Sequence, residues 1–532
     1  MQSFDFLVIG SGIAGLTYAL QVAKLGSVAV LTKGTMIECT TDYAQGGIAA
    51  VLAEADSFEK HVKDTYRAGH ELGKLPVIRA IIEDGPEAIA YLLDIGTRFS
   101  LGNSSGDRAL ENLDLTREGG HSERRVAHAA DSTGHQIMLA LIAACNKNER
   151  ITIFEHHIAI DLITQHHISN ADGFVPGVSC WGAYALHTRT NEVFAFRARK
   201  TMLATGGGAQ VYKNNTNPSI CTGDGYAMAR RAGARLVNME FIQFHPTAFY
   251  SPEGKTFLIS EALRGEGAAL RLQSGETFME RHHPDGCLAP RDIVAGAIDF
   301  EMKKRGDRYV LLDATAIPAE RLRERFPYID GKCRKRDVDF TSQPIPVVPA
   351  AHYFCGGILA TTDGLTDVHN LFVSGEVACS GLHGSNRLAS NSLLSGLVMS
   401  LRAGRHPSNK DEVAFPDIPE WQDVGTFNEN EWVVIGYNRE ILQSIMQGYV
   451  GITRSRRLLK YARARIHNIY QEIENFYQHN VVRHEVIESR NLAIVADIIV
   501  RSALTRRESR GLHQVVDHPG HDDENFQRDT II

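Results

Sequence analysis

Three glycines near the start of the chain have the spacing of a dinucleotide-binding turn. Gly10, Gly12 and Gly15 follow the apolar run 4–9 and precede a helix-like segment at 16–24. In such a turn the first glycine makes the bend, the second lets the backbone approach a pyrophosphate, and the third lets helix pack on strand. The helix N-terminus stabilises the phosphate charge. The residues expected to bind are Gly10, Ser11, Gly12, Ile13, Ala14 and Gly15.

The second predicted strand, residues 28–31, departs from the usual pattern because it is followed by Thr32 and Lys33. An NAD site ordinarily has an acid there that binds the ribose 2′-hydroxyl. Lys33 therefore argues against an ordinary NAD site. It is compatible with NADP or with a flavin site built differently.

Three later segments favour a flavin. The loop 41–48 is rich in glycine and suited to lie against an isoalloxazine ring, and the strand at 201–204 ends in glycines. A late strand at 371–373 leads to Glu376, an acid suited to bind a ribityl hydroxyl. Anchors this far apart in the sequence indicate a long cofactor.

Composition limits the other classes of function. The chain has 532 residues, 43% of them apolar and 22% charged, and a net charge of −7. These values are typical of a globular protein with a large core and disfavour a nucleic-acid or anionic-membrane binder. The eight cysteines form no C-x-x-C pair, so no metal site is predicted. Neither a signal peptide nor a membrane span is apparent, and a cytoplasmic location is expected.

The elements that must position these residues fall into several segments. Residues 4–34 predict strand, glycine turn, helix and strand, and residues 370–405 repeat this pattern. Residues 240–348 form a separate charged unit with prolines near its ends. A linker at 406–420 precedes a helical region at 421–510, which has few glycines and no proline.

Longer motifs resemble those of the fumarate reductase/succinate dehydrogenase flavoprotein family. They are SGIAGL, YAQGGIAA, LTREGGHS, TGDGYAMA, FIQFHPTAFY, SEALRGEGA, LAPRDIVA, VPAAHYFCGGI, GEVACSGLHGSNRLASNSLL and ESRGLH. The resemblance covers residues 4 to about 518. It implies an α/β fold with a Rossmann-like FAD-binding domain at 1–238 and 353–419. An inserted α+β capping domain at 239–352 and a C-terminal helical domain at 420–532 complete the implied plan.

The resemblance implies FAD as the cofactor. Membrane-bound relatives attach it through a histidine five residues before the glutamine of AQGG, and Thr40 stands there in this chain. A hydroxyl cannot make that bond, so FAD is expected to be non-covalent. Beyond the first turn, the expected cofactor contacts are Lys33, Thr40, Thr41, Asp42, Tyr43, Ala44, Gln45, Gly46, Gly47, Ile160, Thr205, Gly206, Gly207, Asp224, Gly375, Glu376, Ser392 and Leu393.

The stretch 115–121 resembles the branch of the family that oxidises L-aspartate. Succinate has no amine, whereas a substrate with an ammonium group gains from a nearby carboxylate. By composition alone Glu118 would be a surface residue. The motif instead makes it the candidate partner of the ammonium.

A dicarboxylate in a closed pocket needs cations and hydrogen-bond donors. The catalytic candidates from the motifs are His245, His352, Arg291 and Arg387, and the candidate substrate contacts are Gln243, Ser260 and Tyr353. Arg291 matches the arginine that relays a proton in fumarate reductases. Because arginine keeps its proton in water, the relay needs a neighbouring carboxylate. Glu261 and Arg264 match that relay and would share a helix face.

The implied reaction is FAD-dependent oxidation of L-aspartate to iminoaspartate, the first step of NAD biosynthesis through quinolinate. Dioxygen, which gives hydrogen peroxide, or fumarate would accept the electrons. A transient contact with quinolinate synthase is a further expectation, because iminoaspartate is unstable.

Two alternatives stay open. One is a soluble fumarate reductase or succinate dehydrogenase flavoprotein subunit. The other is a flavin-containing RNA-binding protein that uses the basic runs 303–305 and 332–336, although the negative net charge disfavours it. One departure from the family concerns Ser395, where relatives usually carry an acid; an irregular helix and weaker cofactor affinity are expected there.

Overall fold

The computed structural model describes residues 1–102, 110–130, 132–168, 177–252, 256–422, 425–426 and 432–532. Its central sheet has the strand order β6-β2-β1-β9-β8-β7, and β16 also pairs with β9. The strands are β1 (Gln2–Ile9), β2 (Val28–Leu31), β6 (Ile151–Phe154), β7 (His157–Thr164), β8 (Cys180–His187), β9 (Val193–Leu203) and β16 (Leu371–Val373). The pairs that join β6, β2, β1, β9 and β16 are parallel. Their carboxyl ends therefore meet at one edge, where ligands bind in such folds.

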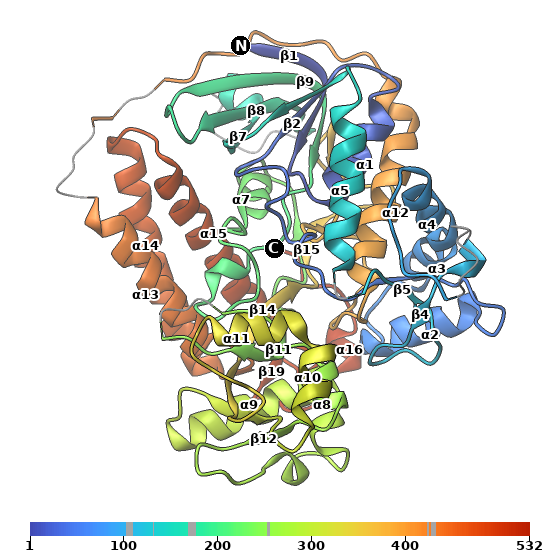
Figure 1. Ribbon diagram of the computed structural model, residues 1–532. Coiled ribbons are helices and arrows are strands. Elements are labelled where there is room, and N and C mark those ends of the chain that lie inside the picture. The colour runs from blue at the N-terminus through green and yellow to red at the C-terminus, as the bar shows by residue number, and fades with distance from the viewer. Residues whose placement is uncertain (103–109, 131, 169–176, 253–255, 423–424, 427–431) are drawn as a thin grey trace.

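Helices cover this sheet because β2 and the carboxyl-terminal half of β1 are apolar and buried on both faces. The helices α1 (Ile13–Val22), α5 (Thr133–Asn146) and α12 (Asn391–Arg405) pack together (Figure 1). On the other side α7 (Asp224–Arg231) packs against β7. The helix α12 is unbroken over 15 residues, so the irregularity predicted after Ser395 is absent. The buried Ser395 hydroxyl points at Met399 Sδ, 3.7 Å away and one turn along the helix.

A second unit lies below the sheet in Figure 1 and has its own apolar core. Its antiparallel sheet has the order β11-β14-β13-β12. The elements are β11 (Ile242–Phe249), β12 (Ala269–Arg271), β13 (Val310–Asp313), β14 (Ile345–Phe354), α8 (Ala262–Gly265), α9 (Arg291–Arg305), α10 (Ala319–Arg325) and α11 (Pro327–Arg334). Strand β14 runs through the predicted boundary at 352/353, so one continuous strand connects this unit to the rest.

Two small sheets and several short helices complete the first 410 residues. One small sheet pairs β3 (Ile48–Ala49), β5 (Val126–Ala127) and β4 (Leu115–Thr116). Another pairs β10 (Leu236–Val237), β15 (Gly357–Leu359) and β17 (Ala378–Cys379). Three helices follow β3 in the sequence: α2 (Phe58–Ala68), α3 (Leu75–Glu83) and α4 (Gly85–Asp94). The remaining turns of helix are α6 (Gln165–Ile168), η1 (Leu110–Asn112), η2 (Ala209–Val211), η3 (Met279–Arg281), η4 (Gly286–Leu288) and η5 (Pro407–Lys410).

The C-terminal region is mainly helical, as predicted, with three packed helices at one side of the molecule (Figure 1). They are α13 (Val433–Tyr449), α14 (Arg456–His479) and α15 (His484–Thr505), and the short α16 (Asp523–Phe526) follows. A two-stranded pairing of β18 (Thr453–Arg454) with β19 (Gln514–Val515) was not predicted. The chain then returns to β10, where Ile532 and Leu236 exchange backbone hydrogen bonds.

Among the described residues, no helix is both long and apolar enough to cross a membrane. Within the same ranges, no set of His, Cys, Asp and Glu side chains is arranged to hold a metal ion.

Candidate active site

A cavity of about 480 Å³ lies between the carboxyl edge of the central sheet and the second unit. Its volume is in the range of cofactor and small-molecule sites. The segments predicted to bind the cofactor contribute residues 9–14, 38–41, 43–47, 204–206, 374–376, 389–390 and 392–393 to its lining. From the other side it is lined by Glu118, His245, Ser260, Glu261, Arg291, His352, Tyr353 and Arg387.

The first glycine turn leaves no room for side chains. Gly10 has φ +114°, and a Cβ there would lie 2.1 Å from the carbonyl oxygen of Ala204. A Cβ on Gly15 would lie 1.9 Å from the carbonyl oxygen of Gly10. Because α1 begins at Ile13, the turn presents a helix N-terminus and bare backbone to the cavity, which fits a pyrophosphate.

Lys33 is fully engaged with protein groups. Its ammonium pairs with Asp224 at 3.0 Å and Glu488 at 2.7 Å, and donates to the Thr222 hydroxyl at 2.6 Å. Burial opposes the charge, but the two carboxylates raise the pKa of Lys33 above its usual value. An NADP 2′-phosphate at this place would meet two carboxylates. The NADP interpretation of Lys33 is therefore wrong.

Polar groups further along the cavity fit a sugar-like chain. Glu376 accepts a hydrogen bond from the backbone N–H of Phe354 at 2.9 Å, and burial raises the pKa of its carboxyl to about 7. The buried Thr205 Oγ1 has no hydrogen-bond partner within the described part of the chain. This oxygen lies against α7, since a Cβ on Gly225 would be 2.1 Å from it, so it is not exposed to the cavity.

Four predicted cofactor residues do not line the cavity. Gly15 packs beneath Gly10, and Gly207 lies against Glu376, whose Oε1 would be 2.2 Å from a Cβ on Gly207. Asp42 contacts His135 Nδ1 at 2.7 Å instead. The side chain of Ile160 belongs to a separate apolar cluster, whereas the neighbouring Ile158 and Ala159 line the cavity. Whether such residues line the cavity depends on the direction of their side chains, which the sequence motifs do not specify.

Arg387 is a buried cation held from behind. Its Nη2 donates to Gln243 Oε1 at 2.8 Å, its Nη1 donates to Ser392 Oγ at 2.8 Å, and its guanidinium lies 4.5 Å from the Tyr353 ring centroid. Gln243 itself does not line the cavity. Its predicted role as a substrate contact is therefore corrected to orientation of the guanidinium.

His245 and His352 face each other, with ring centroids 5.7 Å apart. Burial, together with nearby arginines, lowers the pKa of both imidazoles well below the usual value, so both are neutral near pH 7. The backbone N–H of Thr247 donates to His245 Nδ1 at 3.2 Å. The ring proton of His245 is therefore on Nε2, which makes this atom a hydrogen-bond donor.

Arg291, Glu261 and Arg264 form one charged group. Arg291 Nε donates to Glu261 Oε2, and Arg264 Nη2 lies 3.8 Å from Glu261 Oε1. Burial opposes ionisation of Glu261, but the two guanidiniums lower its pKa below the usual value. The predicted juxtaposition is therefore present. Arg264, however, is behind the cavity wall and donates to the Cys287 carbonyl at 2.5 Å, so it cannot touch a ligand directly.

Glu118 lies beside the glycine loop and the start of α12. Its Oε1 would be 2.7 Å from a Cβ on Gly46, and its Oε2 accepts a hydrogen bond from the Ser390 hydroxyl at 2.6 Å. The Glu118 charge also raises the pKa of Arg291, which places the two groups near each other in the cavity.

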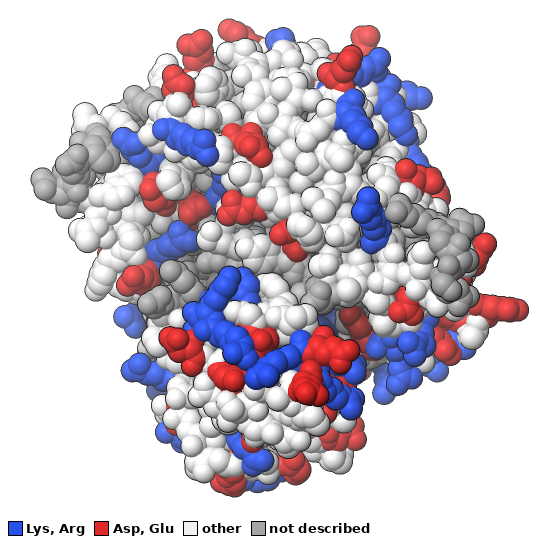
Figure 2. Space-filling view, in the orientation of Figure 1, with Lys and Arg blue, Asp and Glu red and all other residues white. Residues whose placement is uncertain are grey.

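Sequence reasoning missed several residues on the wall formed by the second unit. Tyr328, Lys332 and Arg336 line the cavity, and positive side chains gather where the second unit meets the sheet (Figure 2). The Arg336 guanidinium lies 4.8 Å from the Phe257 ring centroid. The basic run was visible in the sequence, but no local pattern indicated which of its members face inward. The other run, 303–305, is partly neutralised by ion pairs, such as Lys303 with Asp299 at 2.8 Å.

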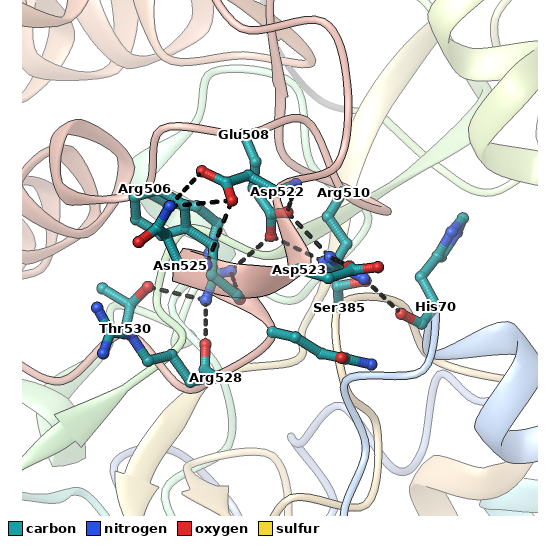
Figure 3. Close-up of polar contacts among 12 residues, drawn as sticks. His70, Ser385, Arg506, Glu508, Arg510, Asp522, Asp523, Asn525, Arg528 and Thr530 are labelled. Atoms are coloured by element: carbon teal, nitrogen blue, oxygen red, sulfur yellow. Dashed lines mark hydrogen bonds and ion pairs between the residues drawn. The ribbon is translucent and has the colours of Figure 1, made fainter.

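The C-terminal segment braces the turn that precedes Arg387, as Figure 3 shows. Arg510 is fixed by Glu508 and donates to the His70 carbonyl at 3.1 Å. Gly511 has φ +51°, and a Cβ there would lie 2.3 Å from Ser385 Oγ. The backbone N–H of residue 512 donates to the Ser385 carbonyl at 3.1 Å. The C-terminal region, for which the sequence predicted no catalytic role, therefore contacts the loop that contains Arg387.

Comparison with known proteins agrees with this arrangement. The FAD binding domain family matches residues 5–393, and the fumarate reductase flavoprotein C-terminal family matches residues 439–532. The L-aspartate oxidase of Pseudomonas aeruginosa is 45% identical over 99% of this chain and 97% of its own length. The chloroplastic L-aspartate oxidase 2-b of Nicotiana tabacum is 46% identical over 99% of this chain and 83% of its own length.

Among solved structures, the quinol fumarate reductase FrdA of E. coli superposes with a TM-score of 0.85. It is 28% identical, and the match covers 100% of this chain and 94% of that one. Sdh1 of Mycobacterium smegmatis superposes with a TM-score of 0.83 at 32% identity, over 98% of this chain and 90% of that one.

Proposed function

Because the chain belongs to the L-aspartate oxidases, a branch of the fumarate reductase and succinate dehydrogenase flavoprotein family, we propose that its cavity carries out FAD-dependent oxidation of L-aspartate to iminoaspartate. This reaction is the first step of NAD biosynthesis. The bound flavin supplies a hydride acceptor and a route for electrons to a second substrate. The bare backbone of the Gly10 turn and the Glu376 carboxyl fit FAD, and Thr40 leaves it non-covalent.

The charge of the cluster around Arg387 and Arg291 is the observation that supports this substrate. In this cluster the guanidiniums of Arg387 and Arg291, with that of Arg264 behind the cavity wall, outnumber the carboxylates of Glu118 and Glu261 by one positive charge. The neutral histidines add none. L-Aspartate has one net negative charge and neutralises the site. Succinate has no ammonium group to donate hydrogen bonds to Glu118.

The chain's own groups then have distinct tasks. Arg387 binds one substrate carboxylate, since its guanidinium is held by neutral partners and has free capacity for an anion. His245 and His352 donate hydrogen bonds without adding charge. Glu118 accepts hydrogen bonds from the ammonium, which must lose a proton before the Cα hydride leaves. The second unit forms one wall of the site.

We also propose that dioxygen or fumarate accepts the electrons. With fumarate, Arg291 donates a proton to carbon, and Glu261 beside it makes this transfer feasible for a group that otherwise keeps its proton. Iminoaspartate must be consumed by a following condensation, for which contact with quinolinate synthase is proposed. The cytoplasmic location stays a prediction.

The direct test is aerobic turnover by the purified yellow protein. We expect hydrogen peroxide from L-aspartate and little or none from succinate. Glu118→Gln should lower the rate with L-aspartate about 10- to 100-fold, the value of a charged hydrogen bond. Peroxide formation from succinate at a rate equal to that from L-aspartate, unaffected by Glu118→Gln, would support the succinate-oxidising alternative instead.

A further inference from the structure

The turn that carries Glu118 docks on the loop that follows Arg387. Residues 118–121 close a tight turn, in which the backbone N–H of His121 donates to the Glu118 carbonyl at 3.2 Å. Gly120 has φ +87°, and a Cβ there would lie 2.7 Å from Leu388 Cδ1. His121 Nε2 lies 2.9 Å from the Ala389 carbonyl oxygen. Together with the bond between Ser390 and Glu118, these contacts fix one register between the two segments.

The tautomer of His121 follows from its second neighbour. Arg125 Nη1 lies 3.1 Å from His121 Nδ1, and a guanidinium only donates. Nδ1 is therefore the acceptor, and the proton on Nε2 is donated to the Ala389 carbonyl. Arg125 is fully buried and held by Asp56 at 2.8 Å and Asp64 at 2.6 Å, so the imidazole has a rigid support.

His121 itself does not line the cavity and cannot touch substrate. We propose that His121 is a positioning residue for substrate discrimination, and this inference rests on the proposed function. Its bond to Ala389 holds the Glu118 carboxylate at a fixed separation from the Arg387 guanidinium. The ammonium and one carboxylate of the amino acid are thereby recognised by a single composite element. A dicarboxylate without an amine needs only the Arg387 part.

Two substitutions separate this role from a structural one. His121→Asn keeps an acceptor near the Nδ1 position but is too short to reach Ala389, whereas His121→Gln places an amide donor near the Nε2 position. Both are compared with the wild type for kcat/KM in L-aspartate oxidation and in fumarate reduction by a reduced viologen dye. His282→Asn, in the second unit and outside the cavity wall, is the matched control.

We expect His121→Asn to lower kcat/KM for L-aspartate about 10- to 100-fold and to change fumarate reduction less than about 3-fold. His121→Gln should restore most of the loss, and the control should change neither activity. An equal loss of both activities in His121→Asn, or no loss, would overturn the inference. A wild type that fails to oxidise L-aspartate would instead overturn the proposed function.

A double-mutant cycle gives a second, independent reading. Ser390→Ala removes the hydroxyl that binds Glu118 and leaves the backbone contact with His121 in place. If His121 acts through this loop, the double variant will lose less kcat/KM for L-aspartate than the product of the fold losses in Ser390→Ala and His121→Asn. Fully multiplicative losses would show that the two residues act independently, against the inference.

Discussion

Substitution of Arg387 by leucine removes the guanidinium but keeps an apolar side chain in its place. The guanidinium is buried and contacts the neutral partners Gln243, Ser392 and the Tyr353 ring. Burial without a tightly paired carboxylate lowers the pKa of Arg387 from its usual value, although the group stays charged. A substrate carboxylate therefore supplies the missing counter-charge.

The magnitude follows from the bonds lost. A bidentate contact between guanidinium and carboxylate contains two charge-assisted hydrogen bonds of about 1.5–3 kcal/mol each. Their partial sum, about 3–5 kcal/mol, corresponds to about 10²- to 10⁴-fold in kcat/KM, because about 1.4 kcal/mol is tenfold. Arg387→Lys keeps the charge but not the fork, so its loss should be intermediate.

The assay combines peroxide formation with the flavin absorbance of the purified variant. We expect Arg387→Leu to be yellow and nearly inactive toward L-aspartate, since the glycine turn that fits the pyrophosphate is untouched. A colourless Arg387→Leu protein would assign this residue to cofactor binding. A kcat/KM within about 3-fold of the wild type would refute its role toward the substrate.

Three further perturbations test other parts of the account. Lys33→Met leaves the buried Asp224 carboxylate without a cation, while Glu488 keeps its ion pair with Arg439. Removing one partner of a buried pair costs about 3–5 kcal/mol, so the variant should melt at a lower temperature and contain less FAD, whereas an unchanged melt would contradict this. Gly511→Ala places a Cβ against the Ser385 hydroxyl at a positive φ, so KM for L-aspartate should rise while FAD is retained, and an unchanged KM would show that the brace is irrelevant. The apoprotein should lose stability as the pH falls from 7 to 5.5. Burial lowers the pKa of His61 to about 3, so this and similar buried histidines stay neutral in the folded protein. In the unfolded chain they take up protons near pH 6.5, which favours unfolding. Glu376, with its pKa raised to about 7, acts in the opposite direction but is outnumbered; a melting temperature that rises on acidification would contradict the neutral histidines.

The parts of the fold that could be predicted are those set by local pattern. Strand, glycine turn and helix at 2–22 follow from an apolar run, a steric requirement at Gly10 and helical periodicity. Strand β2 begins and ends at the predicted residues. The pairing of β18 with β19 could not be predicted, because both strands have only two residues and their partners are far apart in the sequence.

The sequence predicted which residues belong to the site better than it predicted which of their side chains face the cavity. Gln243 is on β11, where the pairing with β14 shifts register between Gln243 and Phe244. Such an irregularity changes which side chains face the cavity, and no sequence pattern reveals it. The inward position of Lys332 and Arg336 depends on how α11 packs, which is a tertiary property. Ser390 was missed because its role appears only when residues 118 and 390 are brought together.

We infer that the cluster of Arg387, Arg291, Arg264, Glu118 and Glu261 binds an amino dicarboxylate and presents it to FAD. Mixing the oxidised protein with L-aspartate or succinate under argon, and following the flavin absorbance, tests it most directly. We expect rapid bleaching by L-aspartate and slow or absent bleaching by succinate at equal concentration. Bleaching by succinate alone, with the flavin fully oxidised in L-aspartate, would contradict it.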